Sequence, residues 1–173
     1  MVSLRPWRET DVPAKLMAFG DPVVQRFSWS RTAPYTEADA GAYFVGQEQA
    51  RRRGEALHFA VVEPANDDVV LGGGSLYDVD LEQSRAAVGY WLAPEARGRG
   101  VVTHAVRLLA RWAFLRAGPG PARADMRSRQ WGASQRVAAR CGFVREGVLR
   151  SHIAFKGGRR DTVVFSMLPH ELR

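Results

Sequence analysis

Two arginines and two glycines alternate at positions 97–100, between a short apolar run and an amphipathic stretch. The run from Val88 to Leu92 predicts a buried strand, and apolar residues at helical spacing predict a helix that starts at Val101. A Gly-rich turn before a helix gathers unpaired backbone N–H groups at the positive end of the helix dipole. Because glycine has no Cβ, an anion can approach that backbone closely. The pattern therefore predicts a site for an anion such as a phosphate.

The turn differs from two common nucleotide-binding loops. The dinucleotide fingerprint needs a third glycine where Thr103 stands, and a Walker loop needs a lysine followed by serine or threonine. The next helix is predicted to bury one broad apolar face, made of Val102, Val106, Leu108, Leu109, Trp112 and Ala113. A Gly-rich turn of this kind can also be purely structural, so the rest of the chain has to decide.

Length and composition restrict the class of protein. The 173 residues fit one domain, which we expect to span 1–173, and 46% hydrophobic content is typical of a folded core. No apolar run reaches the length that crosses a membrane, so we predict no membrane partner. The single cysteine, Cys141, and an N-terminus without a long apolar stretch indicate the cytoplasm. We expect a monomer or a homodimer.

The chain is strongly basic, with a net charge of +7 and a pI near 10.4. Nearly all of this charge is arginine, since Lys15 and Lys156 are the only lysines. One interpretation is a solvated arginine surface, and the other is attraction to a polyanion such as RNA. The arginines are spread along the chain, which favours the solvated surface.

Taken in order, the patterns predict strands at 2–6, 57–63, 69–77, 85–92, 122–127, 143–149 and 161–168. Helices are predicted from a cap at Thr10 to Gly20, from a capping box of Thr36 and Asp39 to about 51–54, from 101 to 117 and from 134 to 140, with a short helix and loop at 23–29. The triplet Gly72 to Gly74 predicts a bulge or a close backbone approach, and 78–84 a polar loop. The order β-α-α-β-β-β-α-β-α-β-β predicts an α/β fold, with one mixed sheet of about seven strands and helices on both faces.

This order resembles the GNAT superfamily of acyl-CoA-dependent N-acyltransferases. Four segments carry the resemblance: 4–11, 88–92, the turn that reads Arg97-x-x-Gly100-x-Val102, and 133–147. They are most similar to the branch of ribosomal-protein N-terminal alanine or serine acetyltransferases. The resemblance implies the GNAT fold and transfer of acetyl from acetyl-CoA, as cosubstrate and without a metal, to a primary amine of a small molecule or a protein N-terminus by direct attack on the thioester.

The resemblance also implies site residues. The backbone of the turn would hold the pyrophosphate of CoA, the central strand would pair with the pantetheine arm, and Ser134 would protonate the departing thiolate. Tyr90 is a second candidate for that acid. The residues implied to bind the donor are Tyr90, Trp91, Leu92, Arg97, Gly98, Arg99, Gly100, Val101, Val102, Thr103, Trp131 and Ser134.

Several positions depart from the branch. Its carboxylates on the central and late strands are replaced by Ala87 and Ile153, its helix glutamate by His104, and its asparagine before the late helix by Trp131. Val102 replaces a smaller loop residue. No carboxylate is left at either base position, so the base stays open.

His152 is the best single candidate for the base, because histidine titrates in the useful range and lies beside the family's position. Neighbouring strand residues face opposite sides, however, so this offset can point His152 away from the site. Asp78, Asp80 and Glu82 could line an amine pocket, or a water relay could replace a base residue.

Three functions remain open from the sequence. The first is the acyl-CoA-dependent N-acetyltransferase. The second is a transferase of the same fold with an acyl- or aminoacyl-RNA donor, suggested by the positive charge and the altered loop. The third is a protein that binds acyl-CoA or a metabolite without turnover, suggested by the missing carboxylates. The loops 28–34 and 78–84 would shape the amine pocket but carry no recognisable code.

Overall fold

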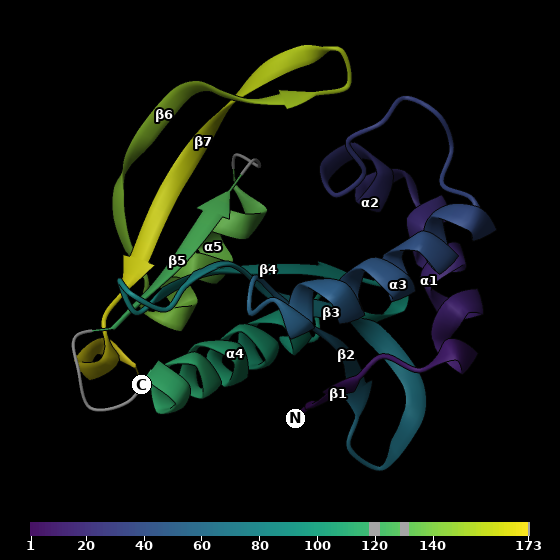
Figure 1. The fold of residues 1–173 in the computed structure, drawn as a ribbon, viewed down its shortest axis with the longest axis horizontal. Coiled ribbons are helices and arrows are strands. Elements are labelled where there is room, and N and C mark those ends of the chain that lie inside the picture. Colours follow the sequence, from purple (N-terminus) through teal and green to yellow (C-terminus); the bar gives the residue numbers. More distant parts are fainter. Residues whose placement is uncertain (118–121, 129–131, 173) are drawn as a thin grey trace.

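The computed structural model describes residues 1–117, 122–128 and 132–172 (Figure 1). The first half of the chain forms β1 (Ser3–Pro6), α1 (Val12–Gly20), α2 (Pro22–Phe27), α3 (Glu37–Arg52), β2 (Leu57–Glu63), β3 (Asn66–Asp80) and β4 (Arg85–Leu92). The second half forms α4 (Val101–Ala117), β5 (Arg123–Ser128), α5 (Ala133–Cys141), β6 (Val144–Phe155) and β7 (Gly158–Met167). The order matches the expected one, and α2 is the short helix that was expected within 23–29.

The strands form one seven-stranded sheet in the order β1-β2-β3-β4-β5-β7-β6. Neighbouring strands are antiparallel except β4 and β5, which run parallel. The parallel pair is connected through α4, which crosses one face of the sheet (Figure 1). The mixed α/β sheet expected from the sequence is confirmed.

The glycine triplet of β3 lies between two helical layers. A Cβ on Gly74 would contact Leu109 of α4, whereas a Cβ on Gly73 would contact the indoles of Trp91 and Trp7. Successive strand residues face opposite sides, so α4 covers one face and the aromatic cluster beneath α1 and α3 covers the other. The close backbone approach predicted for 72–74 is present, and helices lie on both faces.

Helix α4 contributes the centre of the core. Val106, Leu109 and Ala110 are fully buried and pack against residues of β3, β4 and β5. Leu108, expected on the same face, is instead 39% exposed, because it lies a full 100° round the helix from Leu109. The expected apolar face is therefore correct except at its edge.

Two local predictions at the N-terminal half have opposite outcomes. Thr36 and Asp39 form the predicted capping box of α3, with Thr36 Oγ1 accepting from the Asp39 N–H at 3.2 Å. The predicted cap of α1 at Thr10 is wrong. Helix α1 begins after Asp11, whose carboxylate accepts hydrogen bonds from Arg5 and the Arg8 N–H. The ion pair of Arg5 and Asp11 holds the turn before α1 without a threonine cap.

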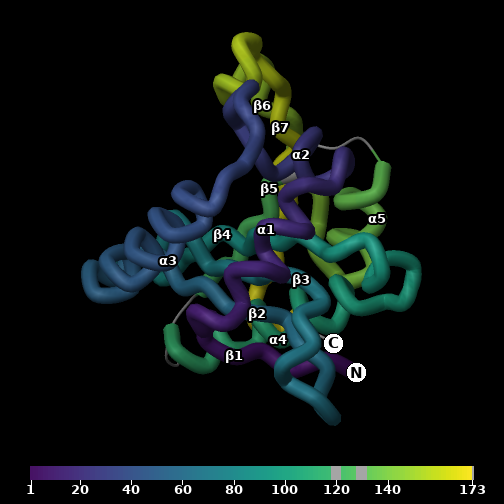
Figure 2. The backbone as a smooth tube through the Cα atoms, turned by 90° about the vertical axis from the view of Figure 1, so that its right-hand side faces the viewer, coloured from purple at the N-terminus to yellow at the C-terminus, as the bar shows by residue number. Residues whose placement is uncertain are grey.

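The hairpin of β6 and β7 reaches across the molecule to the segment between α2 and α3 (Figure 2). At its tip, the Lys156 N–H donates to the Ser30 carbonyl at 3.0 Å. Both strands are longer than the sequence indicated, because their pairing continues through the irregular stretch around Ser151, a residue with φ of 51°. The hairpin thus fixes the position of the 28–34 segment.

A matched pair of glycine substitutions tests this layering. Gly72→Ala should lower the free energy of unfolding by about 1–3 kcal/mol, because the new Cβ would collide with the backbone carbonyl of Trp91. Gly46→Ala, on an open face of α3, should raise it by about 0.5–1 kcal/mol. Urea unfolding measures both changes, and a neutral Gly72→Ala would contradict the close approach.

Candidate active site

Strands β4 and β5 separate halfway along β4. They pair from Arg85 with Arg123 to Val88 with Met126, and no further pair forms among the described residues. Beyond Val88, Gly89 to Leu92 pair with β3 alone. The backbone groups of this stretch that face β5 are therefore free of a strand partner on that side. An extended ligand can pair with such an edge as an added strand does.

The Gly-rich turn lies at the end of this open edge and leads into α4. Gly98 and Gly100 have φ of +74° and +75°, and a Cβ on either would find no atom within 4 Å. Positive φ explains why glycine is needed here, and the open space leaves the turn accessible. The first N–H groups of α4, from Val101 to Thr103, have no preceding helical carbonyl as partner. The turn therefore has the open backbone geometry that the expected anion site needs, and anion binding itself stays a prediction.

The two arginines of the turn have different roles. Arg97 forms a salt bridge with Asp21 at 2.5 Å and also donates to the Leu92 carbonyl at 3.2 Å. Its hydrogen bond holds the pKa of Asp21 below the usual value. Asp21 also caps α2 by accepting from Val23 and Val24. Arg97 therefore ties α2 to the turn, whereas Arg99 is exposed and only loosely paired with Glu63, at 3.4 Å.

Tyr90 and Ser134, the two candidate acids, lie together. Their hydroxyl oxygens are 2.8 Å apart and share a hydrogen bond. Ser134 is the second residue of α5 and makes no cap, since the N-cap is Gly132. Burial raises the pKa of Tyr90, so its phenol keeps its proton at neutral pH. The pair therefore has a proton to donate, and it lies on the face of β4 against which α4 and α5 pack.

A single cavity of about 780 Å³ joins these features. Its lining includes the open stretch of β4, Arg97 and Val102 at the turn, and the pair of Tyr90 and Ser134. It continues past β4 to α1, α2, α3 and the 28–31 part of the expected amine-pocket loop. The cavity therefore extends to both sides of β4: one side lies at the turn, where the resemblance implies the donor, and the other, here called the acceptor side, lies under α1 and α3.

The acceptor side contains residues that the sequence did not single out. Lys15 is 1% exposed, and its Nζ lies over Tyr43 at 3.4 Å and over Phe19 at 4.6 Å from the ring centroids. Trp7 and Trp91 complete this aromatic cage at 5.2 and 5.4 Å. Burial lowers the pKa of Lys15 to about 7. A buried lysine in a cavity is a functional signal that only the packing of α1 reveals.

His58 also faces this side of the cavity, although its sequence context is unremarkable. It pairs across the sheet with Ser75, and Ser75 pairs with Gly89 of β4. Its Nδ1 lies 3.1 Å from the Tyr43 hydroxyl. Burial, and then the charge of Lys15, lower the pKa of His58 to about 4. The imidazole is thus neutral at physiological pH, and strand register would have been the signal needed to find it.

The remaining candidates lie outside the lining of this cavity. His152 is exposed on β6, with Nδ1 3.1 Å from the Thr162 hydroxyl. Asp78 and Asp80 belong to β3, not to a loop, and form salt bridges with Arg127 and Arg85. Glu82 is exposed in the turn that follows. Of the two segments expected to shape the amine pocket, only the first therefore contributes.

The substituted family positions are accounted for in the same way. Ala87 is buried between strands β3 and β5, and His104 is exposed, with Nδ1 3.2 Å from the Gly100 carbonyl. Ile153 is half-buried on β6. Trp131 lies outside the described residues. Cys141 is buried in the core, where burial raises its pKa to about 11, so it packs as a small apolar side chain.

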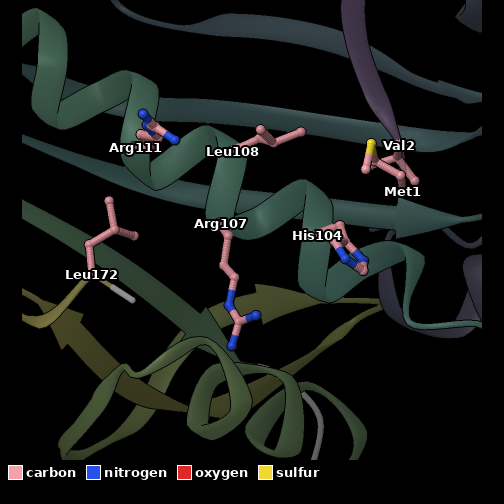
Figure 3. A pocket seen from close by; sticks show the side chains of 7 residues that line it. All are labelled: Met1, Val2, His104, Arg107, Leu108, Arg111 and Leu172. Atoms are coloured by element: carbon pink, nitrogen blue, oxygen red, sulfur yellow. The ribbon is translucent and has the colours of Figure 1, made fainter. Parts of the chain in front are cut away.

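A second cavity, of about 330 Å³, lies on the outer side of α4 (Figure 3). Leu108, His104 and Arg107 line it together with the chain start and Leu172. In Figure 3, Arg107 points down toward α5, where its guanidinium donates to the Arg140 carbonyl at 2.7 Å. Tyr90, Ser134, Arg97 and Val102 line the larger cavity and not this one, so the larger cavity is the candidate active site.

Comparison with known proteins gives the class. The family model for the acetyltransferase (GNAT) domain matches residues 2–144, and the chain belongs to this family. The Bacillus subtilis protein named "Probable N-acetyltransferase YjcK" is 28% identical over 96% of this chain and 93% of its own length.

Solved structures of acetyltransferases share the fold. RimL, a ribosomal L7/L12 alpha-N-protein acetyltransferase, superposes with a TM-score of 0.82 at 22% identity, covering 96% of this chain and 90% of its own. The microcin C7 self-immunity acetyltransferase MccE, in complex with acetyl-CoA and AMP, also gives 0.82, at 20% identity over 96% and 92%. The protein is therefore a GNAT acetyltransferase. No helix in the described part of the chain is long and apolar enough to span a membrane.

The caged lysine predicts an unusual pH dependence of stability. Below about pH 7 the fold holds a buried ammonium, and between pH 7 and about 10.5 the folded chain binds fewer protons than the unfolded chain. Stability of the wild type should therefore rise with pH across this window relative to Lys15→Met. Urea unfolding measures the free energy of unfolding of Lys15→Met relative to the wild type. This difference should favour the variant more at pH 6 than at pH 9. A mutant-minus-wild-type difference that is equal at both pH values would contradict the charged cage.

Proposed function

We propose that the protein transfers an acetyl group from acetyl-CoA to a primary amine of a small molecule or a protein N-terminus. One observation supports this above all: Arg97 and Val102 of the Gly-rich turn and the paired hydroxyls of Tyr90 and Ser134 line the same cavity, which passes β4 to a separate acceptor side. A transferase needs two substrates to meet from opposite sides of a proton donor. The cavity has this layout.

The residues present fit a CoA thioester. Gly98 and Gly100 leave an open cradle before α4, which suits a pyrophosphate, and the unpaired edge of Gly89 to Leu92 suits an amide-bearing arm. MccE, which shares the fold, was crystallised with acetyl-CoA. When bound, the thioester supplies an activated acyl carbon. Arg97 contributes by holding the turn through Asp21, because its guanidinium is already engaged.

The protein's own part in the reaction is to position the amine and to supply a proton. As the amine nitrogen bonds to the acyl carbon, the carbon–sulfur bond breaks and the sulfur leaves as a thiolate. The thiolate needs a proton, which the hydrogen-bonded pair of Tyr90 and Ser134 provides. Either hydroxyl is the immediate donor, and the other is hydrogen-bonded to it. The raised pKa of Tyr90 keeps the pair protonated until the sulfur departs.

The proton on the attacking amine has no carboxylate acceptor at Ala87 or Ile153. His152 lies outside the cavity lining and would have to act through water, and the lowered pKa of His58 makes its imidazole a weak base. A water relay along the cavity is the simplest route. The similarity in fold to RimL, an alpha-N-protein acetyltransferase of ribosomal L7/L12, supports a protein N-terminus as one acceptor.

Binding of the donor is tested at Gly100. Gly100→Asp puts a Cβ and a negative charge into the cradle and should abolish acetyl-CoA binding measured by calorimetry. Gly54→Asp is the matched control, because Gly54 also has positive φ and open space but lies beyond α3. It should bind as the parent does. A folded Gly100→Asp variant with unchanged affinity would reject the cradle.

Turnover is tested at the hydroxyl pair. Ser134→Ala and Tyr90→Phe should each lower kcat by about 10²-fold with little change in KM for acetyl-CoA, and the double variant should lose little more, because the two groups act as one. CoA thiol release measures this, with and without ribonuclease to test for an RNA donor. Multiplicative losses would mean that the hydroxyls act independently.

His152 has a separate test through the pH profile. If it relays the amine proton, His152→Ala should flatten the rise of kcat/KM toward alkaline pH. An unchanged profile would exclude it and leave the water relay.

A further inference from the structure

Among the described residues, the acceptor side of the cavity contains one lysine without a counter-ion. One lysine and three arginines line the described part of the cavity, and the arginines form salt bridges: Arg31 with Asp39 at 2.7 Å, Arg97 with Asp21, and Arg127 with Asp78. The lysine is Lys15, and within the described chain no carboxylate oxygen lies within 4.0 Å of its Nζ. Asp39 is the only carboxylate among the described lining residues, and Arg31 and Thr36 already engage it.

Aromatic rings alone are an incomplete environment for this ammonium. Cation–π contacts offset part of the cost of burial, and Tyr43, Phe19, Trp7 and Trp91 all contribute. The aromatic rings have no conventional hydrogen-bond acceptor, whereas an ammonium has three N–H donors. The cage therefore leaves these donors without acceptors. A buried cation without a counter-ion keeps an uncompensated cost of desolvation. An apolar residue would pack here without that cost, so the lysine points to a ligand.

A second buried donor lies beside the first. The Tyr35 hydroxyl is buried and has no hydrogen-bond partner in the described structure. The Tyr35 ring packs on Phe19 at 4.5 Å between centroids, and the same Phe19 ring faces Lys15 Nζ. Both side chains line the one cavity. Two unsatisfied donors, one of them cationic, thus border the same aromatic patch, and an anion could engage both.

We propose, resting on the proposed function, that Lys15 and Tyr35 form an anion subsite on the acceptor side, and that it takes a carboxylate carried by the amine substrate. The aliphatic part of such an acceptor packs on Trp91 and Phe19, whose rings are 5.4 Å apart, and its amine extends toward Tyr90. A carboxylate fits because it accepts from an ammonium and a phenol together. Its source is either a free amino acid or an acidic side chain near a peptide N-terminus.

The experiment compares acceptors that differ only in one carboxylate. The first arm uses ω-amino acids of two to six carbons against their primary amides. The second uses N-terminally free dipeptide amides with glutamate against glutamine at the second position. We expect kcat/KM to favour the carboxylate member at least tenfold in one arm, and the favoured arm identifies the source. Equal rates for both members in both arms would overturn the subsite.

Variants locate the effect. Lys15→Met should reduce the preference to less than twofold by slowing only the carboxylate member, and Tyr35→Phe should reduce it partially. Arg31→Met is the matched control, because it removes a positive charge from the same cavity but not the caged one, and it should keep the preference. If Lys15→Met slows both members equally, or if Arg31→Met abolishes the preference, the assignment is wrong.

Binding separates this inference from the proposed function. The acetylated products, such as N-acetyl-4-aminobutyrate and its amide, can be titrated against tryptophan fluorescence, since Trp91 and Trp7 border the cage. The wild type should bind the carboxylate form at least tenfold more tightly, and Lys15→Met should not discriminate. Discrimination in binding without CoA thiol release from any amine would reject the transferase and keep the subsite. Thiol release without discrimination in rate or binding would reject the subsite and keep the transferase.

Discussion

The separation of β4 from β5 after Val88 is the constraint on which the site depends. Two parallel strands that stayed paired would saturate the backbone of β4 on both sides and leave no edge for a ligand. Once they part, Gly89 to Leu92 keep an open edge. The same gap admits the start of α5, so that Ser134 meets Tyr90, and it places the Gly-rich turn at the end of the open stretch. In the proposed function, donor binding and proton supply thus both depend on one break in the sheet.

The charge of the chain is organised by ion pairs. The net charge of +7 suggested either a solvated surface or attraction to a polyanion, and many of the arginines engage nearby carboxylates. Arg97 has the clearest structural consequence, because its partner Asp21 caps α2 and so connects the acceptor side to the donor turn. Lys15 differs from these arginines, since it is buried among rings and has no carboxylate partner among the described residues. This buried lysine is the basis for the inferred acceptor chemistry.

The acceptor side depends on contacts between elements distant in sequence. The hairpin tip holds Ser30 through the Lys156 N–H, while α1 and α3 bring Lys15 and Tyr43 onto β2 and β3. Glycines at 72–74 allow this, since larger residues would push Trp91 and Leu109 away from the sheet. One face of β3 therefore packs against α4, and the other packs against the aromatic cage.

Local patterns of spacing and of glycine, proline and capping residues predicted the Gly-rich turn before α4, the bounds of β2 and β4 and the capping box of α3. The family fold came from the resemblance of four segments in the right order. The sequence also singled out Tyr90 and Ser134, though not their contact across 44 positions. Only the tertiary structure decided that Asp78 and Asp80 belong to a strand, that His152 lies outside the cavity, and that Lys15 and His58 line it. The physical reason is that burial and cross-strand register are set by which elements pack together, and one-dimensional spacing carries no record of that packing.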